Sequence, residues 1–222
     1  MNINILTIFP EIFNALNSGV VSRSIKNKSL KLNTYDIRKN AVNKHNHVDA
    51  KPYGGGEGMV IMAEPVVKSL NQIDKTKLGK VIYLSPQGKK LNQKKVVNLS
   101  KLRNITLICG RYEGIDQRVR DQLVDREISV GDYVLTNGSL AASVLVDSVA
   151  RHVPGVLGDG DSLIDESFEG QLLSYPQYTR PNEYRGMSVP EVLLSGNHSQ
   201  IEHWRNDQRK IKTRKLRPDL LN

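Results

Sequence analysis

The sequence predicts an α/β fold built on a mostly parallel sheet. The chain opens with a strand-like alternation of polar and apolar residues, and a helical pattern follows directly. Strand and helix patterns then alternate as far as residue 151, which is typical of a parallel sheet covered by helices. Several of the predicted strands are followed by glycine-bearing loops, and such loops form the ligand-binding edge of α/β sheets.

The elements follow from hydrophobic periodicity taken in chain order. Strands are predicted at residues 2–9, 30–37, 80–85, 105–110, 127–130 and 133–135. Helices are predicted at residues 11–16, 64–72, 91–102, 115–124, 139–151 and 199–216. The helix at 139–151 is largely apolar, so we expect it to be buried and to close the first domain.

The character of the chain changes after residue 157. Residues 158–175 begin as an acidic, glycine-containing stretch with no basic residue up to position 170, which predicts a linker or hinge. Residues 176–222 start with prolines and end in a basic helical pattern, with seven Lys or Arg against three Asp or Glu after position 200. We therefore predict a first domain at 1–157, a hinge at 158–175 and a small helical domain at 176–222.

Composition indicates an intracellular protein that binds a polyanion. The 222 residues carry a net charge of +9, and a basic surface gains free energy by releasing counterions from nucleic acid. A basic charge that simply follows a lysine-rich proteome is the alternative. The N-terminus lacks a signal-peptide pattern and no apolar run is long enough to span a membrane, so we expect a cytoplasmic protein with no membrane anchor.

Metal and disulfide chemistry find little support in the sequence. Cys109 is the only cysteine, which rules out an intrachain disulfide and any multi-cysteine metal site. The five histidines show no metal-ligand spacing. We therefore assign no metal-binding residues.

Glycine-rich loops are the strongest candidates for a ligand site. Residues 52–59 (PYGGGEGM) give a backbone that can approach a ligand closely, although neither nucleotide-binding fingerprint, G-x-G-x-x-G or G-x-x-x-x-G-K-[ST], occurs in the chain. Residues 83–88, 109–116 and 129–135 are three further loops that follow predicted strands. Together they could wrap a compact cofactor through backbone contacts; taken singly, each could equally be a tight turn.

These loops and the segments around them carry a family resemblance. It runs through residues 7–10 (TIFP), 52–59, 83–88, 109–116, 131–135 (GDYVL), 149–151 with 154–158 (PGVLG), 178–181 (YTRP), 189–193 (VPEVL) and 195–198 (SGNH). With these motifs in this order, the chain resembles the bacterial tRNA (guanine-N1)-methyltransferases of the SPOUT class. Those enzymes modify the guanine immediately 3′ of the anticodon, position 37.

The resemblance implies a SPOUT-type α/β domain with a deep trefoil knot, followed by a small helical C-terminal domain. It implies S-adenosyl-L-methionine (AdoMet) as methyl donor, a homodimer with shared active sites, a tRNA anticodon arm as partner, and magnesium as a further cofactor. The implied cofactor-binding residues are Tyr83, Leu84, Ser85, Pro86, Gly110, Tyr112, Glu113, Gly114, Ile128, Val130, Gly131, Asp132, Tyr133, Val134, Leu135 and Gly138. The implied contacts to RNA and the target base are Asp49, Tyr53, Gly54, Gly55, Gly56, His198 and Arg205.

Methylation at N1 of guanine needs a base for the N1 proton and a cation for the charge that builds on the neighbouring carbonyl oxygen. By resemblance, Glu166 is the base and Arg151 the cation, with Asp165 in reserve because the family more often has Asp at the position of Glu166. Without the resemblance, Arg151 and Glu166 would be interpreted as a solvated ion pair of little consequence.

The sequence departs from the family pattern at two further places. Ala50 precedes Lys51 where the family often has Asp, and Asn137 and Ser139 flank Gly138 where the family has Gly and Glu. These changes affect side-chain contacts with target and cofactor. Two alternatives stay open: a SPOUT enzyme acting on ribosomal RNA or on another tRNA position, and an RNA-binding or ribosome-assembly protein without activity.

Overall fold

The computed structural model describes residues 1–42, 47–157 and 165–221. The protein divides into two compact units, Met1–Gly158 and Asp159–Asn222. The three-part division expected from the sequence stays a prediction.

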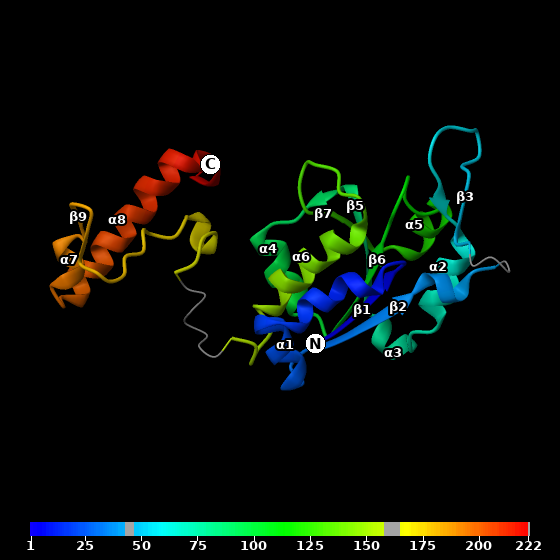
Figure 1. The fold of residues 1–222 in the computed structure, drawn as a ribbon, viewed down its shortest axis with the longest axis horizontal. Helices are drawn as coiled ribbons and strands as arrows, with labels where there is room; N and C mark the ends of the chain where they lie inside the picture. The colour runs from blue at the N-terminus through cyan, green and yellow to red at the C-terminus, as the bar shows by residue number, and fades with distance from the viewer. Residues whose placement is uncertain (43–46, 158–164, 222) are drawn as a thin grey trace. The chain divides into compact units, whose positions relative to one another are not determined.

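A five-stranded parallel sheet forms the centre of unit 1 (Figure 1). The strands are β1 (Asn2–Thr7), β2 (Lys31–Asp36), β5 (Lys80–Lys90), β6 (Asn104–Cys109) and β7 (Arg126–Ser129), in the spatial order β2-β1-β6-β5-β7. All four strand pairings are parallel, which confirms the parallel sheet predicted from the sequence. The central strands are apolar on both faces because both are covered by helices.

Two hydrophobic layers flank the sheet. Ile3 and Ile5 of β1 point into one layer and Leu6 into the other, as the two-residue period of a strand requires. The first layer is covered by η1 (Pro10–Asn17), α1 (Gly19–Lys26), α4 (Gln93–Ser100) and α6 (Gly138–Ala150). The second is covered by η2 (Ile37–Asn40), α2 (Ala63–Asn71), α3 (Lys75–Leu78) and α5 (Gln117–Leu123), on the opposite side of the sheet in Figure 1.

Several local features differ from the sequence prediction, including the short helix α3, which was not predicted. Residues 133–135 are not a strand: Tyr133 and Val134 are exposed in the loop before α6, and no neighbouring strand pairs with them. The helix α1 was not predicted: it spans only eight residues, and it begins with a glycine and two valines, which are weak helix formers. The segment predicted as a helix at 11–16 is a 3-10 helix.

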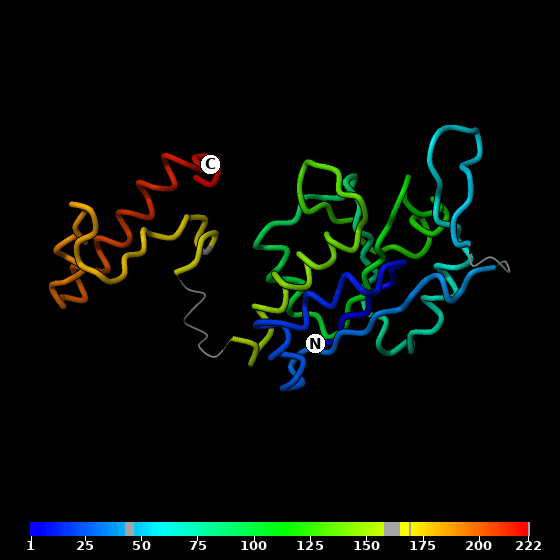
Figure 2. Tube along the Cα trace, viewed as in Figure 1, coloured from blue at the N-terminus to red at the C-terminus, as the bar shows by residue number. Residues whose placement is uncertain are grey.

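The glycine cluster forms the tip of a short antiparallel hairpin. β3 (Asp49–Ala50) pairs with β4 (Val60–Ile61), so both ends of residues 51–59 are fixed. Figure 2 shows this loop, in cyan, extending away from the sheet. Gly54, Gly55, Gly56 and Gly58 all adopt positive φ, which explains why glycine occupies these positions.

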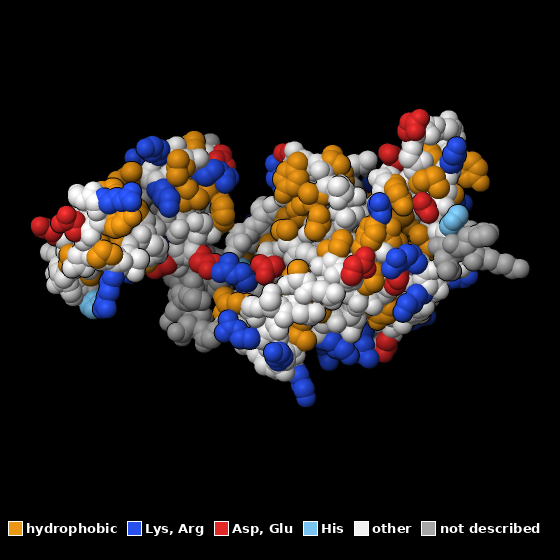
Figure 3. Space-filling view, in the orientation of Figure 1, with side chains coloured by type: hydrophobic (Ala, Val, Ile, Leu, Met, Phe, Trp, Pro, Cys, Tyr) orange, Lys and Arg blue, Asp and Glu red, His pale blue; other side chains and the backbone are white. Residues whose placement is uncertain are grey.

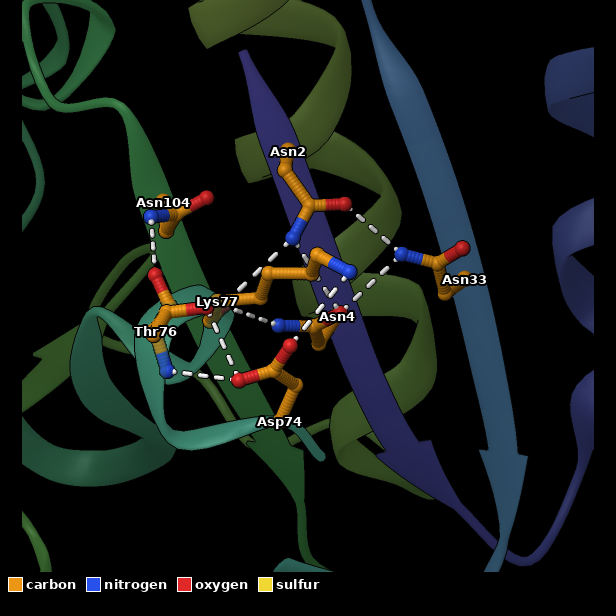
Figure 4. Close-up of polar contacts among 7 residues, drawn as sticks. All are labelled: Asn2, Asn4, Asn33, Asp74, Thr76, Lys77 and Asn104. Carbon is orange, nitrogen blue, oxygen red and sulfur yellow. Dashed lines mark hydrogen bonds and ion pairs between the residues drawn. The ribbon is translucent and has the colours of Figure 1, made fainter. Parts of the chain in front are cut away.

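A polar network closes the amino-terminal end of the sheet (Figure 4). The buried amide of Asn4 donates to the Lys77 carbonyl (2.9 Å) and to Thr106 Oγ1 (3.2 Å), while its oxygen accepts from Asn33 (3.0 Å). Asn104 donates to the Thr76 carbonyl, which also ties the α3 turn to β6. The network holds this end of the sheet, opposite the strand ends that carry the glycine loops.

Unit 2 is organised around one long helix. Its elements are η4 (Glu169–Gln171), β8 (Glu183–Tyr184), β9 (Met187–Ser188), α7 (Glu191–Leu194), α8 (His198–Leu216) and η5 (Pro218–Leu221). Asn197 caps α8 by accepting from the Gln200 N–H, and Thr213 of α8 is fully buried. Lys and Arg side chains lie on the drawn face of each unit (Figure 3).

Candidate active site

The first loop of the candidate site interrupts β5. Residues up to Leu84 pair with β7, residues 85–88 bulge out, and Lys89 resumes the pairing at the same partner, Ile128. A Cβ on Gly88 would lie 2.4 Å from the Ile128 nitrogen, so only glycine allows the strand to return so closely. Residues 83–87 are thereby presented at the carboxyl end of the sheet.

The second loop follows β6 and begins at Gly110. Tyr112 adopts a left-handed conformation (φ +57°), and Gly114 donates its N–H to the Arg111 carbonyl at 2.9 Å. Glu113 donates its N–H to the Met59 carbonyl at 3.0 Å, and the Ile61 N–H donates to the Gly114 carbonyl at 2.9 Å. The hairpin that carries the glycine cluster is therefore attached to this loop.

The third loop joins β7 to α6. Ser129 Oγ donates to the Gly131 carbonyl at 2.8 Å, and Asn137 caps α6 by accepting from the Ser139 and Leu140 N–H groups. Gly138, the first residue of α6, donates its N–H to the Gly110 carbonyl at 2.7 Å. The start of α6 thus crosses to the end of β6, and the second and third loops meet there.

The three loops enclose one cavity of about 300 Å³. All the predicted cofactor-binding residues line it except Asp132, whose carboxylate pairs with Lys90. The structure therefore gathers residues from positions 83 to 138 at the carboxyl ends of three adjacent strands, where ligands of open α/β sheets bind.

Glycines set the size of this cavity. A Cβ on Gly110 would lie 2.6 Å from Tyr83 Oη, and one on Gly114 would lie 2.8 Å from the same atom. A Cβ on Gly138 would lie 2.8 Å from the Gly110 nitrogen. These positions are tight because the loops pack directly against Tyr83 and against one another. A side chain at any of them would therefore force the loops that form the cavity wall to move.

Two titratable groups of the cavity wall, Arg120 and Tyr83, are paired or buried, and Cys109 is buried behind it. Arg120 makes a bidentate ion pair with Glu127 (2.8 and 2.9 Å) and also donates to Gln87. Burial raises the pKa of Tyr83, although the nearby Arg120 opposes that shift, so the phenol stays protonated at neutral pH. Burial also raises the pKa of Cys109, behind the cavity, to about 12.

A second cavity of about 1070 Å³ lies between the hairpin and helices α2 and α5. Tyr53 and Lys51 line it from the hairpin, and Arg118 from α5. Tyr53 is fully exposed, and no heavy atom lies within 4 Å of a Cβ built on Gly54, Gly55 or Gly56. The predicted target-binding loop therefore stands open to solvent.

The predicted catalytic residues fall in different units. Arg151 follows the last turn of α6, where its N–H donates to the Asp147 carbonyl. Glu166 is half-buried in unit 2, and the carboxylate of its neighbour Asp165 accepts from the Tyr175 hydroxyl at 3.1 Å. Arg151 is not among the residues of unit 1 that line the cavity, and the roles of both residues stay a prediction.

The remaining predicted RNA contacts are spread over both units. Asp49 belongs to β3, and His198 is the exposed first residue of α8. The guanidinium of Arg205 lies 4.8 Å from the centroid of the Tyr175 ring. Their contacts with RNA stay a prediction.

Comparison with known proteins identifies the family. The family model described as "tRNA (Guanine-1)-methyltransferase TrmD" matches residues 1–222. Proteins from Staphylococcus aureus strains MRSA252, JH9 and Newman, each named tRNA (guanine-N(1)-)-methyltransferase, are 50% identical over 222 residues, covering all of this chain and 91% of theirs. The chain belongs to the tRNA (guanine-1)-methyltransferase family. The family resemblance found in the sequence is thereby confirmed.

In this methyltransferase, the predicted residue list left out several residues of the cavity wall, although Gln87, Arg111 and Ser129 lie within the predicted loops. They are Gln87, Arg111, Arg120, Ser129, Thr136, Asn137 and Ala141. The guanidinium of Arg111 lies between two rings, 4.6 Å from the centroid of Phe9 and 4.7 Å from that of Tyr112. Arg111 lies inside the predicted loop at 109–116, so the sequence could have placed it in the cavity wall. Arg120 lies on a helix outside the predicted loops, and nothing in the sequence pattern indicated its position.

The described parts of this methyltransferase contain neither a cluster of metal ligands nor a membrane-spanning helix. Within residues 1–42, 47–157 and 165–221, no three His, Cys, Asp or Glu residues are grouped to hold a metal ion. Over the same residues, no helix has the length and apolar character needed to cross a bilayer.

Proposed function

We propose that this tRNA guanine-N1 methyltransferase modifies the guanine immediately 3′ of the anticodon, position 37. The reaction class follows from family membership, and AdoMet as methyl donor follows from the class. The observation that carries the proposal is the single cavity built from the loops after three adjacent parallel strands. The position of the guanine and the residue roles are the proposed part.

The cavity suits AdoMet in size and in chemistry. Its wall combines apolar residues such as Leu84, Ile128 and Leu135 with glycine-bearing loops, which fits a purine nucleoside that carries an amino acid. When bound there, AdoMet supplies an electrophilic methyl group on its sulfonium sulfur. The predicted set from Tyr83 to Gly138 would hold it.

Glu166 and Arg151 would provide the remaining chemistry. As the guanine N1 gains the methyl group, its proton passes to the Glu166 carboxylate. The Arg151 guanidinium stabilises the charge that develops on the adjacent carbonyl oxygen. Each residue supplies a group of the type that the reaction needs, and the assignment rests on the family resemblance.

The proposed trefoil knot is supported by the path of the chain after β7. β7 pairs with β5 at the edge of the sheet, yet the start of α6 bonds to Gly110 at the end of β6. Arg111 and Asn137 also form a β-bridge at this crossing. Such a crossing is compatible with a knot, in which the chain would also pass through one of the preceding loops.

A homodimer is the proposed assembly. Leu140 and Val144 lie one turn apart on α6 and are 43% and 54% exposed, and Val134 in the preceding loop is 83% exposed. Exposed apolar side chains in such numbers are typical of surfaces that a partner covers. Light scattering of the Val144→Glu variant should show a shift towards monomer; an unchanged dimer would exclude this face.

The proposed RNA partner is a tRNA anticodon arm. Phosphate contacts would come from the basic helix α8 in a chain with a net charge of +9. A stacking surface would come from the exposed Tyr53 beside the glycine loop.

Magnesium enters the proposal through the family resemblance alone. Methyl transfer measured with and without EDTA tests it, and equal rates would exclude a requirement.

Transfer of labelled methyl from AdoMet to tRNA transcripts tests the proposed function. A transcript with guanine at position 37 should become labelled, and the same transcript with adenine there should not. Equal labelling of both would indicate another target position. Absence of both labelling and AdoMet binding would favour the RNA-binding protein without activity.

A further inference from the structure

Unit 2 holds Asp165 in place through its side chain. One carboxylate oxygen, Oδ2, accepts a hydrogen bond from the Tyr175 hydroxyl at 3.1 Å, and Oδ1 lies 3.7 Å from Nη1 of Arg209 on α8. Tyr175 is 7% exposed and the Arg209 side chain 11% exposed. Asp165 is therefore attached to two nearly buried groups, one of them on the main helix of the unit.

The tyrosine that binds Asp165 is itself fixed. Arg205, one turn before Arg209 on α8, places its guanidinium 4.8 Å from the centroid of the Tyr175 ring. Two residues before Tyr175, the Leu173 N–H donates to Oγ1 of the fully buried Thr213 at 2.8 Å. The segment that carries Tyr175 thus packs on α8 through both backbone and side chains.

The residue on the other side of Glu166 is also tied down. Ser167 Oγ donates to Ser174 Oγ at 3.1 Å and accepts from the Ser174 N–H at 3.0 Å. Phe168 donates its N–H to the Leu172 carbonyl at 2.7 Å, which closes the turn between them. Glu166 therefore stands between two residues that are anchored to the same packed segment.

The carboxylate of Asp165 makes structural contacts within unit 2. Its oxygens are engaged by a hydroxyl and by a guanidinium, and accepting a proton from a substrate would remove the charge that Arg209 faces. Its contacts are those of an anchor. The two carboxylates at 165 and 166 thus have different structural tasks.

We propose that Asp165 is a positioning residue that, with Tyr175 and Arg209, holds the backbone at Glu166 in one place for proton abstraction. This inference rests on the proposed function, in which Glu166 is the base. A base held in a fixed position gains rate because little conformational freedom is lost at the moment of reaction. Residues 165–175 accordingly belong to the packed structure of unit 2.

The test compares single-turnover methyl transfer across pH in full-length variants. Asp165→Asn and Tyr175→Phe should each lower the rate about 10-fold and keep the rise of rate with pH, because the base is still present. Glu166→Gln should lower the rate by at least about 100-fold and abolish that rise, and Glu166→Asp should restore part of it. Glu183→Gln, which changes an exposed carboxylate in β8 of the same unit, is the matched control and should behave as wild type.

Hydrogen exchange of the same variants separates the anchor from the chemistry. Asp165→Asn and Tyr175→Phe should speed exchange of the Leu173 and Ser174 amides at least about 10-fold, whereas Glu166→Gln should not. Two results would overturn the positioning role of Asp165. The first is amide exchange that does not change in Asp165→Asn and Tyr175→Phe. The second is a rate that no longer rises with pH in Asp165→Asn but still rises with pH in Glu166→Gln. If Glu166→Gln keeps its activity while exchange changes as expected, the anchor stands and the base assignment fails.

Discussion

Gly110→Ala should close part of the candidate cofactor cavity. The new Cβ would lie 2.6 Å from Tyr83 Oη and 3.0 Å from its Cε2, well inside ordinary contact distance. Tyr83 is only 4% exposed, and a Cβ on Gly114 would lie 2.8 Å from the same hydroxyl, so the ring could move only into the cavity that it lines. Gly110 does not have a positive φ, so the effect would come from packing and not from backbone strain.

Overpacking of this kind costs about 1–3 kcal/mol. If the whole of this cost destabilises the AdoMet-bound form alone, AdoMet should bind about 5- to 150-fold more weakly, which titration calorimetry measures. Urea unfolding of the same variant measures the part that falls on the fold. Wild-type affinity together with wild-type stability would refute the packing argument.

A double-mutant cycle shows whether Tyr83 is the obstacle. Tyr83→Phe removes the hydroxyl atom that lies nearest to the new Cβ. Combined with Gly110→Ala, it should recover at least about 1 kcal/mol relative to the sum of the single changes. Additive single effects would place the clash elsewhere.

Further predictions concern stability and reactivity. Asn4→Leu should lower the free energy of unfolding, measured by urea titration, by about 1–3 kcal/mol. The reason is that the Asn33 amide and the Lys77 carbonyl lose a buried hydrogen-bond partner. Asn2→Leu, at the edge of the network, should lower the free energy of unfolding by less. The Cys109 thiol, whose pKa burial raises to about 12, should not react with Ellman's reagent at pH 8 until the chain unfolds; rapid reaction in the folded protein would contradict its burial. Burial raises the pKa of Asp125, but Lys80 and the Val81 N–H outweigh it and leave the pKa below its ordinary value of 3.8. Its stabilisation is therefore present above pH 3.8 and lost as pH falls through the lower folded value, so Asp125→Asn should flatten stability against pH in that acidic window; an unchanged slope would contradict this.

The parallel sheet was predictable because its strands carry a strong local signal. Ile3, Ile5 and Leu6 are apolar and fully buried, and the burial alternates between the two faces of the sheet. Residues 133–135 carry similar apolar character, yet they form a loop because no neighbouring strand is available there. Pairing is a property of the whole sheet, so the local pattern alone did not distinguish the two cases.

The candidate cavity was predictable in its loops and less so in its side chains. Glycine-bearing loops after strands located the wall between Tyr83 and Gly138. Arg120 reaches the cavity from α5 through its ion pair with Glu127, a contact that depends on the packing of a helix against β7. The anchor of Asp165 on Tyr175 and Arg209 likewise joins residues far apart in the chain, and no sequence period marks it.

Mapping the modified nucleoside tests the central claim most directly. A tRNA transcript is incubated with the protein and AdoMet, digested to nucleosides and to defined fragments, and analysed by mass spectrometry. The account predicts N1-methylguanosine in the fragment that carries the nucleotide immediately 3′ of the anticodon, and in no other fragment. A methyl group on another atom or at another position would contradict it.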